Sequence, residues 1–93
     1  MKSFADLERE TAAVQLAFLL ADLATANTFL DVAETTSDNV TRERNIGNAN
    51  TAHEAVTRFF PRVTMTALQT TDVQDRLGLL RGRITAMEQT QAR

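Results

Sequence analysis

The chain has no cysteine, tryptophan or tyrosine, and its 93 residues include only one proline, one histidine and three glycines. Without cysteine it can form neither a disulfide framework nor a thiolate metal site, and its redox compartment cannot be read from composition. Proline and glycine are the residues that most often interrupt helices and form tight turns. Their scarcity, together with the lack of any segment that alternates apolar and polar residues, excludes a β-rich fold.

An excess of charge of one sign is also lacking. Ten basic and twelve acidic residues leave a net charge of −2, which argues against nucleic acid as the main partner, because excess positive charge drives phosphate binding. The balance differs along the chain. Seven acids and two bases give residues 1–38 a net charge of −5, whereas five acids and eight bases give residues 39–93 a net charge of +3. We expect this asymmetry to favour packing of the N-terminal segment against the rest.

The few helix breakers divide the chain into three predicted helices. A cluster of short polar residues at 35–39 interrupts the first helical pattern, because such side chains compete for backbone hydrogen bonds. Pro61 ends the second, since the residue before a proline avoids the helical region. We therefore expect helices over about residues 4–35, 39–60 and 67–89.

Polar residues at the predicted helix starts support these boundaries. Ser3 with Asp6, and Thr66 with Gln69, have the spacing of a capping box, in which each side chain binds the backbone amide of the other residue. Asp38 stands where the second helix needs an N-cap.

Within each predicted helix, the residues of one face recur at alternating steps of three and four, the spacing of a buried stripe. In the first helix they are Ala12, Leu16, Leu19, Leu23, Ala26, Leu30 and Ala33. In the second they are Ile46, Ala49, His53, Val56 and Phe60, and in the third Val73, Leu77, Leu80, Ile84 and Met87. Three such stripes with short connections predict an all-α fold, an up-down-up antiparallel three-helix bundle with a long first helix, as one domain over residues 1–93.

The first helix carries another apolar row, which we call the second stripe, about 100° around the helix from the first. Its residues are Phe4, Leu7, Val14, Phe18, Phe29 and Val32. Two interpretations of the second stripe are open. Either the first helix contacts one of the other two helices with each of its stripes, or the second stripe is an interface with another molecule. The first helix should extend past the ends of the other two by roughly ten residues. This overhang would leave Phe4 and Leu7 bare, and it favours an interface with a second copy or with a partner protein's helix.

No residue that carries chemistry is arranged as a catalytic or metal site. His53 has no second ligand at metal-binding spacing, so we expect it at the edge of the core, hydrogen-bonded to a neighbour. Asp22 falls near the polar edge of the first helix and is expected to be solvated. Ser3 and Ser37 stand at helix ends, and no nucleophile motif or glycine-rich phosphate loop occurs. We expect no catalytic, cofactor-binding or metal-binding residue, and no enzyme.

Seven arginines of the second and third predicted helices and their junction leave a nucleic-acid-binding module open as an alternative function. They are Arg42, Arg44, Arg58, Arg62, Arg76, Arg81 and Arg83. Arg42 and Arg44 are two residues apart, as are Arg81 and Arg83, so the members of each pair lie on different sides of a helix. The spacings of Asp72 with Arg76 and of Glu54 with Arg58 are those of local ion pairs. Both features argue against one basic face. A small-ligand-binding bundle is a further alternative.

The N-terminal segment predicts no membrane partner. Residues 12–24 are apolar at eleven of thirteen positions, but they are fewer than the roughly 20 residues that span a bilayer, and they include Gln15 and Asp22. Three acids precede this stretch, which does not fit a secretory signal. We expect a cytoplasmic protein.

Residues 45–61 resemble the second helix of a tetratricopeptide-type hairpin, in which small residues stand at the helix crossing, an aromatic residue late in the helix and a proline just beyond. Here the small residues are Ala52 and Ala55, the aromatic residue is Phe59 and the proline is Pro61. The first helix lacks the family's tryptophan, leucine-glycine and tyrosine signature, and no second copy follows at a period of about 34 residues. Residues 58–63, Arg-Phe-Phe-Pro-Arg-Val, are also similar to a segment of short helical proteins from bacteria.

The hairpin resemblance implies a helix-binding scaffold rather than an enzyme, although one hairpin alone cannot form the family's concave groove. Together with the second stripe, it leads us to expect a non-enzymatic interaction module. Such a module would form a homodimer or bind a partner helix through the second stripe.

Overall fold

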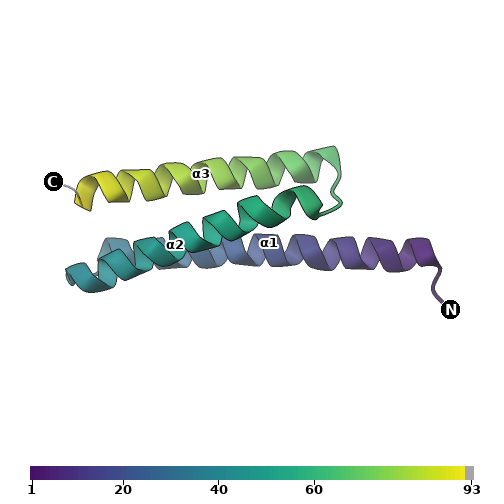
Figure 1. Cartoon of the computed structure of the whole chain (residues 1–93), viewed down its shortest axis with the longest axis horizontal. Helices are drawn as coiled ribbons and strands as arrows, with labels where there is room; N and C mark the ends of the chain where they lie inside the picture. Colours follow the sequence, from purple (N-terminus) through teal and green to yellow (C-terminus); the bar gives the residue numbers. More distant parts are fainter. Residues whose placement is uncertain (92–93) are drawn as a thin grey trace.

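The computed structural model describes residues 1–91 and contains three α-helices: α1 (Phe4–Thr35), α2 (Asn39–Phe59) and α3 (Ala67–Gln91). A 3-10 turn, Phe60–Arg62, follows α2. Within the described residues there is no strand. Figure 1 shows that α2 is antiparallel to both α1 and α3. The predicted all-α, up-down-up bundle with a long first helix is therefore confirmed.

The helices begin at the side chains that the sequence indicates. The Ser3 hydroxyl accepts a hydrogen bond from the Asp6 amide at 3.1 Å, and the Asp6 carboxylate accepts one from the Ser3 amide at 3.3 Å. The same reciprocal pair joins Thr66 and Gln69 at 3.1 and 2.9 Å. Asp38 caps α2. These bonds satisfy amides that have no partner inside their own helix.

The end of α1 is held by an arginine from α2. Arg42 Nη2 donates to the Thr36 carbonyl at 2.7 Å, and its Nε donates to the Ala33 carbonyl at 3.2 Å. The last carbonyls of a helix lack partners within the helix, and a cation beside them is also favoured by the helix dipole. Arg42 therefore closes the short connection between α1 and α2 and places the start of α2 beside the end of α1.

The core forms where the predicted stripes meet. Its buried residues are Leu19, Leu23, Ala26, Leu30 and Ala33 of α1, Ile46, Ala49 and Val56 of α2, and Val73, Leu80 and Ile84 of α3. Leu16, Phe60, Leu77 and Met87 pack half-buried at its edges. The packing of α1 against α2 is the most extensive in the bundle, because the small side chains of Ala26, Ala33 and Ala49 let the two backbones approach closely.

The N-terminal part of α1 extends past the bundle. In Figure 1 it projects beyond the connection between α2 and α3, and the molecule measures 57 × 23 × 18 Å. Residues 1–11 are all exposed except Asp6, which is half-buried. The length of α1, 32 residues or about 48 Å, exceeds that of α2, 21 residues or about 31 Å. The predicted overhang is therefore present.

Candidate functional site

The second stripe is largely exposed in the folded chain. The exposed fractions are 77% for Phe4, 50% for Leu7, 55% for Val14, 65% for Phe18 and 40% for Val32. Phe29 differs from the others, since it is half-buried and packs against the edge of the core. The stripe thus has one side chain fixed against the bundle and five that face water.

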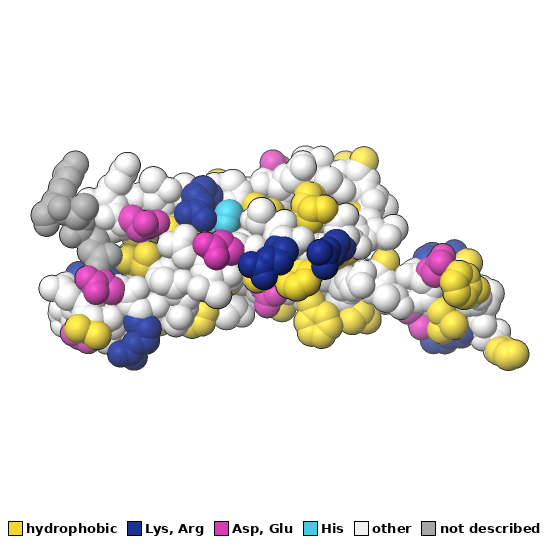
Figure 2. All heavy atoms as spheres, viewed as in Figure 1, with side chains coloured by type: hydrophobic (Ala, Val, Ile, Leu, Met, Phe, Trp, Pro, Cys, Tyr) yellow, Lys and Arg dark blue, Asp and Glu magenta, His cyan; other side chains and the backbone are white. Residues whose placement is uncertain are grey.

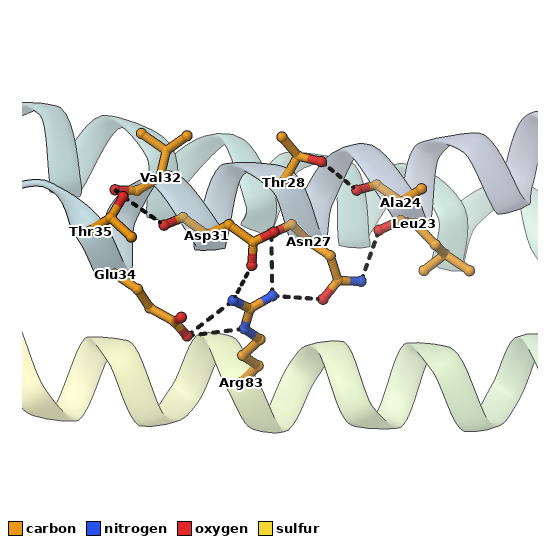
Figure 3. A network of polar contacts seen from close by, with 9 residues as sticks. All are labelled: Leu23, Ala24, Asn27, Thr28, Asp31, Val32, Glu34, Thr35 and Arg83. Atoms are coloured by element: carbon orange, nitrogen blue, oxygen red, sulfur yellow. Dashed lines mark hydrogen bonds and ion pairs between the residues drawn. The ribbon is translucent and has the colours of Figure 1, made fainter.

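The third helix does not cover the second stripe. It joins α1 through Arg83, whose guanidinium contacts side chains on another side of α1 (Figure 3). Asn27, Asp31 and Glu34 form that side. Around the helix axis these residues lie well away from Phe18, with the buried stripe between them. The interpretation in which the second stripe contacts the remaining helix therefore does not describe this bundle.

Arg83 makes the densest polar cluster in the part of the chain that the structure describes. Its Nη1 donates to Asn27 Oδ1 at 3.0 Å and to the Asn27 carbonyl at 3.2 Å. Its Nη2 donates to Asp31 Oδ1 at 2.6 Å, and its Nε donates to Glu34 Oε1 at 3.2 Å. The hydrogen bond to Asp31, followed by the contacts with Glu34, raises the pKa of Arg83 above its ordinary value. Every donor group of the guanidinium is engaged within the chain, so this cluster holds the fold and leaves no arginine fork for a ligand.

Beside the second stripe, α1 and α2 form a shallow groove. Asp22 and Phe29 line it from α1, and Asn48, Thr51, Ala52 and Ala55 line it from α2. Figure 2 shows hydrophobic side chains at the protruding end of α1 and again along the lower edge near the middle of the molecule, next to basic side chains. Asp22 is exposed at the edge of this groove, as expected.

The end of α2 adds an aromatic and basic element to the surface. Phe59 is 47% exposed, and the Arg62 guanidinium lies 6.0 Å from the centre of its ring. Such cation–π contacts are favourable by about 0.5–1 kcal/mol at exposed sites. Phe59 and Pro61 are residues that carry the tetratricopeptide resemblance, and here they form the exposed corner between α2 and α3.

His53 lies at the edge of the core, hydrogen-bonded to a neighbour as expected. Arg81 Nη2 is 3.2 Å from His53 Nδ1, and because arginine can only donate, Nδ1 accepts and the proton of the neutral ring is on Nε2. Burial lowers the pKa of His53, the charge of Arg81 lowers it further, and a hydrogen bond with the Leu77 backbone opposes both. Within residues 1–91 no group of three potential ligands could hold a metal ion.

The arginines do not form one basic surface. Arg42, Arg76, Arg81 and Arg83 are engaged inside the chain, with backbone carbonyls, carboxylates or amide side chains. The predicted local pair of Asp72 and Arg76 forms at 3.1 Å. The other predicted pair, Glu54 with Arg58, does not form within the described residues, and Arg58 is exposed.

The length and composition of α1 are those of a helix that could cross a bilayer. It is the one described helix with this property: its most apolar 18 residues have a mean hydropathy of 1.4, and 22% of that stretch is buried. The expectation that the apolar segment is too short fits residues 12–24 but not α1 as a whole. Core helices of soluble proteins and N-terminal signals share these properties.

No family model, curated protein or solved structure matches this chain. The resemblances to a tetratricopeptide hairpin and to short bacterial helical proteins therefore stay predictions.

Sequence reasoning missed the Arg83 cluster. Asn27, Asp31 and Glu34 recur at steps of four and three along the first helix, which is the spacing of one face. A polar row beside the buried stripe could have been recognised as the side that receives an arginine from the third helix. That row would also have shown that α1 has two neighbours without using the second stripe.

Proposed function

We propose that this chain is a non-enzymatic helical interaction module whose second stripe binds an α-helix of another polypeptide, by self-association or with a partner protein. The observation that carries the proposal is the exposure of five large apolar side chains on one face of a helix that already buries its other stripe. Large apolar side chains that stay exposed on one face of a helix are typical of interaction sites in soluble proteins.

The energy available is sufficient for a specific contact. Fully covering a phenylalanine or leucine side chain stabilises by about 1.5–3 kcal/mol, and buried aromatic anchors supply most of the affinity of many interfaces. Phe18 is the anchor nearest the middle of α1 among the exposed side chains of the second stripe, and Val14 lies one turn before it on the same face. The mechanism is burial of these rings against a helix, and it requires no cofactor.

We place the module in the cytoplasm. Along α1, the carboxylates of Asp22, Asp31 and Glu34 are exposed, and ionised groups are costly inside a bilayer. The Arg83 cluster gives two of these carboxylates a partner within the bundle. Both features favour a helix that packs in a soluble bundle over one that leaves it for a membrane.

The test is the solution mass, measured by light scattering after size exclusion over a tenfold range of concentration. We expect a mass above the 10.3 kDa of one chain. Phe18→Asp should return it to that of one chain without loss of helical circular dichroism. Leu79→Asp is the matched control, since Leu79 is 77% exposed but lies on α3, and it should associate like the wild type. Leu7→Asp, in the overhang, provides a second variant that touches no core residue.

Three results would contradict the proposal. Undiminished association of both the Phe18 and the Leu7 variants would remove the second stripe from the interface. Unfolding of Phe18→Asp would assign Phe18 to the core. A monomeric wild type, with capture of partner proteins equal in Phe18→Asp and Leu79→Asp, would leave the second stripe without a binding role.

A further inference from the structure

We infer that the occupant of the second stripe is the same stripe of a second copy, packed antiparallel, with Phe18 of one chain against Ala21 of the other. The inference rests on the proposed function and specifies its partner and orientation. It follows from the spacing, the sizes and the charges of the exposed side chains on α1.

The exposed face of α1 has the repeat of a coiled-coil seam. Two sets of positions recur every seven residues, and together they alternate at steps of three and four. The first set is Phe4, Thr11, Phe18, Thr25 and Val32, and the second is Leu7, Val14, Ala21 and Thr28. All nine side chains are exposed. A seven-residue repeat that the chain's own bundle leaves uncovered fits a second helix lying along it.

Side-chain size along this seam is uneven, and the unevenness selects the orientation. The N-terminal half carries Phe4, Leu7, Val14 and Phe18, whereas Ala21, Thr25 and Thr28 make the next part small. A parallel pair would oppose Phe18 to Phe18 and Thr25 to Thr25, which crowds one layer and leaves space in another. An antiparallel pair sets large against small in the two central layers, where Phe18 meets Ala21 and Val14 meets Thr25, as close packing requires.

The resulting layers can be stated. With Phe18 opposite Ala21, Val14 meets Thr25 and Leu7 meets Val32 of the other chain. Thr11 meets Thr28, and neither hydroxyl is left without a partner when it is covered. Thr11 Oγ1 donates to the Leu7 carbonyl at 3.0 Å and Thr28 Oγ1 donates to the Ala24 carbonyl at 3.1 Å, both within α1. Polar groups bonded in this way can be buried at little cost.

Charge supports the same orientation. Glu8 is exposed in the overhang, and in this register it lies level with residue 31 of the other chain. The start of α2 is beside that level, because Arg42 binds the Ala33 carbonyl. Arg44 lies there, one helical turn before the groove residue Asn48. Arg44 is exposed and forms no ion pair within the described part of the chain, so it is available to Glu8 of the second copy. In a parallel pair Glu8 of one chain would instead lie level with Glu8 of the other.

The arrangement also covers the overhang. Each N-terminal segment would lie along the C-terminal half of the other copy's α1, which belongs to the three-helix bundle. The exposed rings and aliphatic side chains of two such faces carry on the order of 1,000 Å² of accessible surface, which reaches the lower range of specific interfaces.

Cysteine cross-linking tests the orientation cleanly, because the chain has no cysteine of its own. The double variant Leu7→Cys/Val32→Cys is oxidised mildly in the full chain, and the disulfides are assigned by peptide mapping. The two cysteines of one chain are 25 residues apart on a helix, roughly 37 Å, so they cannot bridge to each other. We expect a covalent dimer joined by bonds between residues 7 and 32. The single variant Leu7→Cys and the α3 control Leu79→Cys should form only background amounts of covalent dimer.

Each other outcome overturns the inference in a recognisable way. Bonds between residues 7 and 7, and between 32 and 32, would show a parallel pair, and the proposed helix-binding function would stand. No cross-link above the Leu79→Cys background, together with a monomeric wild type, would exclude a second copy. In that case, co-sedimentation of the wild type but not of Phe18→Asp with phosphatidylcholine vesicles would assign the stripe to a membrane surface, against the proposed function as well.

Discussion

Arg83 of α3 and Asp31 of α1 form an ion pair of 2.6 Å between Nη2 and Oδ1, with the arginine side chain 27% and the aspartate side chain 67% exposed. The two residues of the pair are 52 positions apart in sequence, and they join the first and third helices. Because the guanidinium also binds Asn27 and Glu34, the contact fixes the position of α3 along α1 as well as its distance.

Arg83→Met should destabilise the chain by about 1–2 kcal/mol, because it removes charge-assisted bonds that are only partly exposed to water. Arg76→Met is the matched control: it removes the exposed pair with Asp72 and should cost no more than about 0.5 kcal/mol. Urea unfolding followed by circular dichroism measures both. Equal losses in the two variants would show that the Arg83 cluster is an ordinary surface contact.

Stability should fall as the pH drops from 7 toward 5. The pKa of His53 is lowered in the folded state, so below the ordinary value of 6.5 the unfolded chain binds the proton more readily than the folded one. The penalty is complete once the pH is below the folded pKa, and it is absent above 6.5. His53 is the chain's only histidine, and the lowered pKa values of Asp6 and Asp38 act only at more acidic pH.

His53→Gln tests the assignment, since glutamine can still accept a hydrogen bond but does not titrate. The free energy of unfolding of this variant, measured by urea titration at several pH values between 5 and 7, should be nearly constant. A slope that persists in the variant would place its origin elsewhere.

Leu30→Ala should cost about 2–5 kcal/mol, because Leu30 is fully buried between the helices and its removal leaves a cavity. Leu79→Ala removes the same atoms from a side chain that is 77% exposed and should change stability by less than about 0.5 kcal/mol. Thermal unfolding of the two variants gives the comparison. A small effect at Leu30 would mean that α1 and α2 repack around the gap.

Replacing the helical glycines with alanine should stabilise the chain. Gly47, Gly78 and Gly82 lie inside α2 and α3, and at each of them an added Cβ would meet nothing within 4 Å. Alanine loses less backbone entropy on folding, so each change should add about 0.5–1 kcal/mol. Differential scanning calorimetry would detect the rise in Tm. A decrease at any one glycine would indicate a contact there that the single folded chain does not show.

The helices were predictable because their signals are local. Ser3 with Asp6 and Thr66 with Gln69 act within one turn, and the steps of three and four in the buried stripes need only the geometry of a single helix. The structure differs at the end of α2, where Phe60 begins a 3-10 turn, since Pro61 has no amide to continue the α-helix.

Which face of α1 is covered by another helix could not be predicted from such local signals. Phe18 and Phe29 share one face of α1, yet only Phe29 packs against the bundle, because α2 reaches that end of α1 and then diverges from it (Figure 1). Spacing shows that two residues share a face, but the crossing of two helices determines which of them is covered. The docking of α3 through Arg83 depends in the same way on a helix distant in sequence.

The unequal packing of the three helices has a consequence for how the chain opens. The first two helices are joined by the widest contact and by Arg42, whereas α3 is attached along a narrower line and contains two of the three glycines. Amide hydrogens of α3 should therefore exchange with solvent before those in the middle of α1. The exchange would occur through a partly open form in which α3 has detached while α1 and α2 stay packed together. In that form the pocket for Val73, Leu80 and Ile84 is vacant, and the α3 of a neighbouring molecule could enter it. We therefore expect that exchange of whole helices between chains at high concentration would produce dimers without using the exposed face of α1.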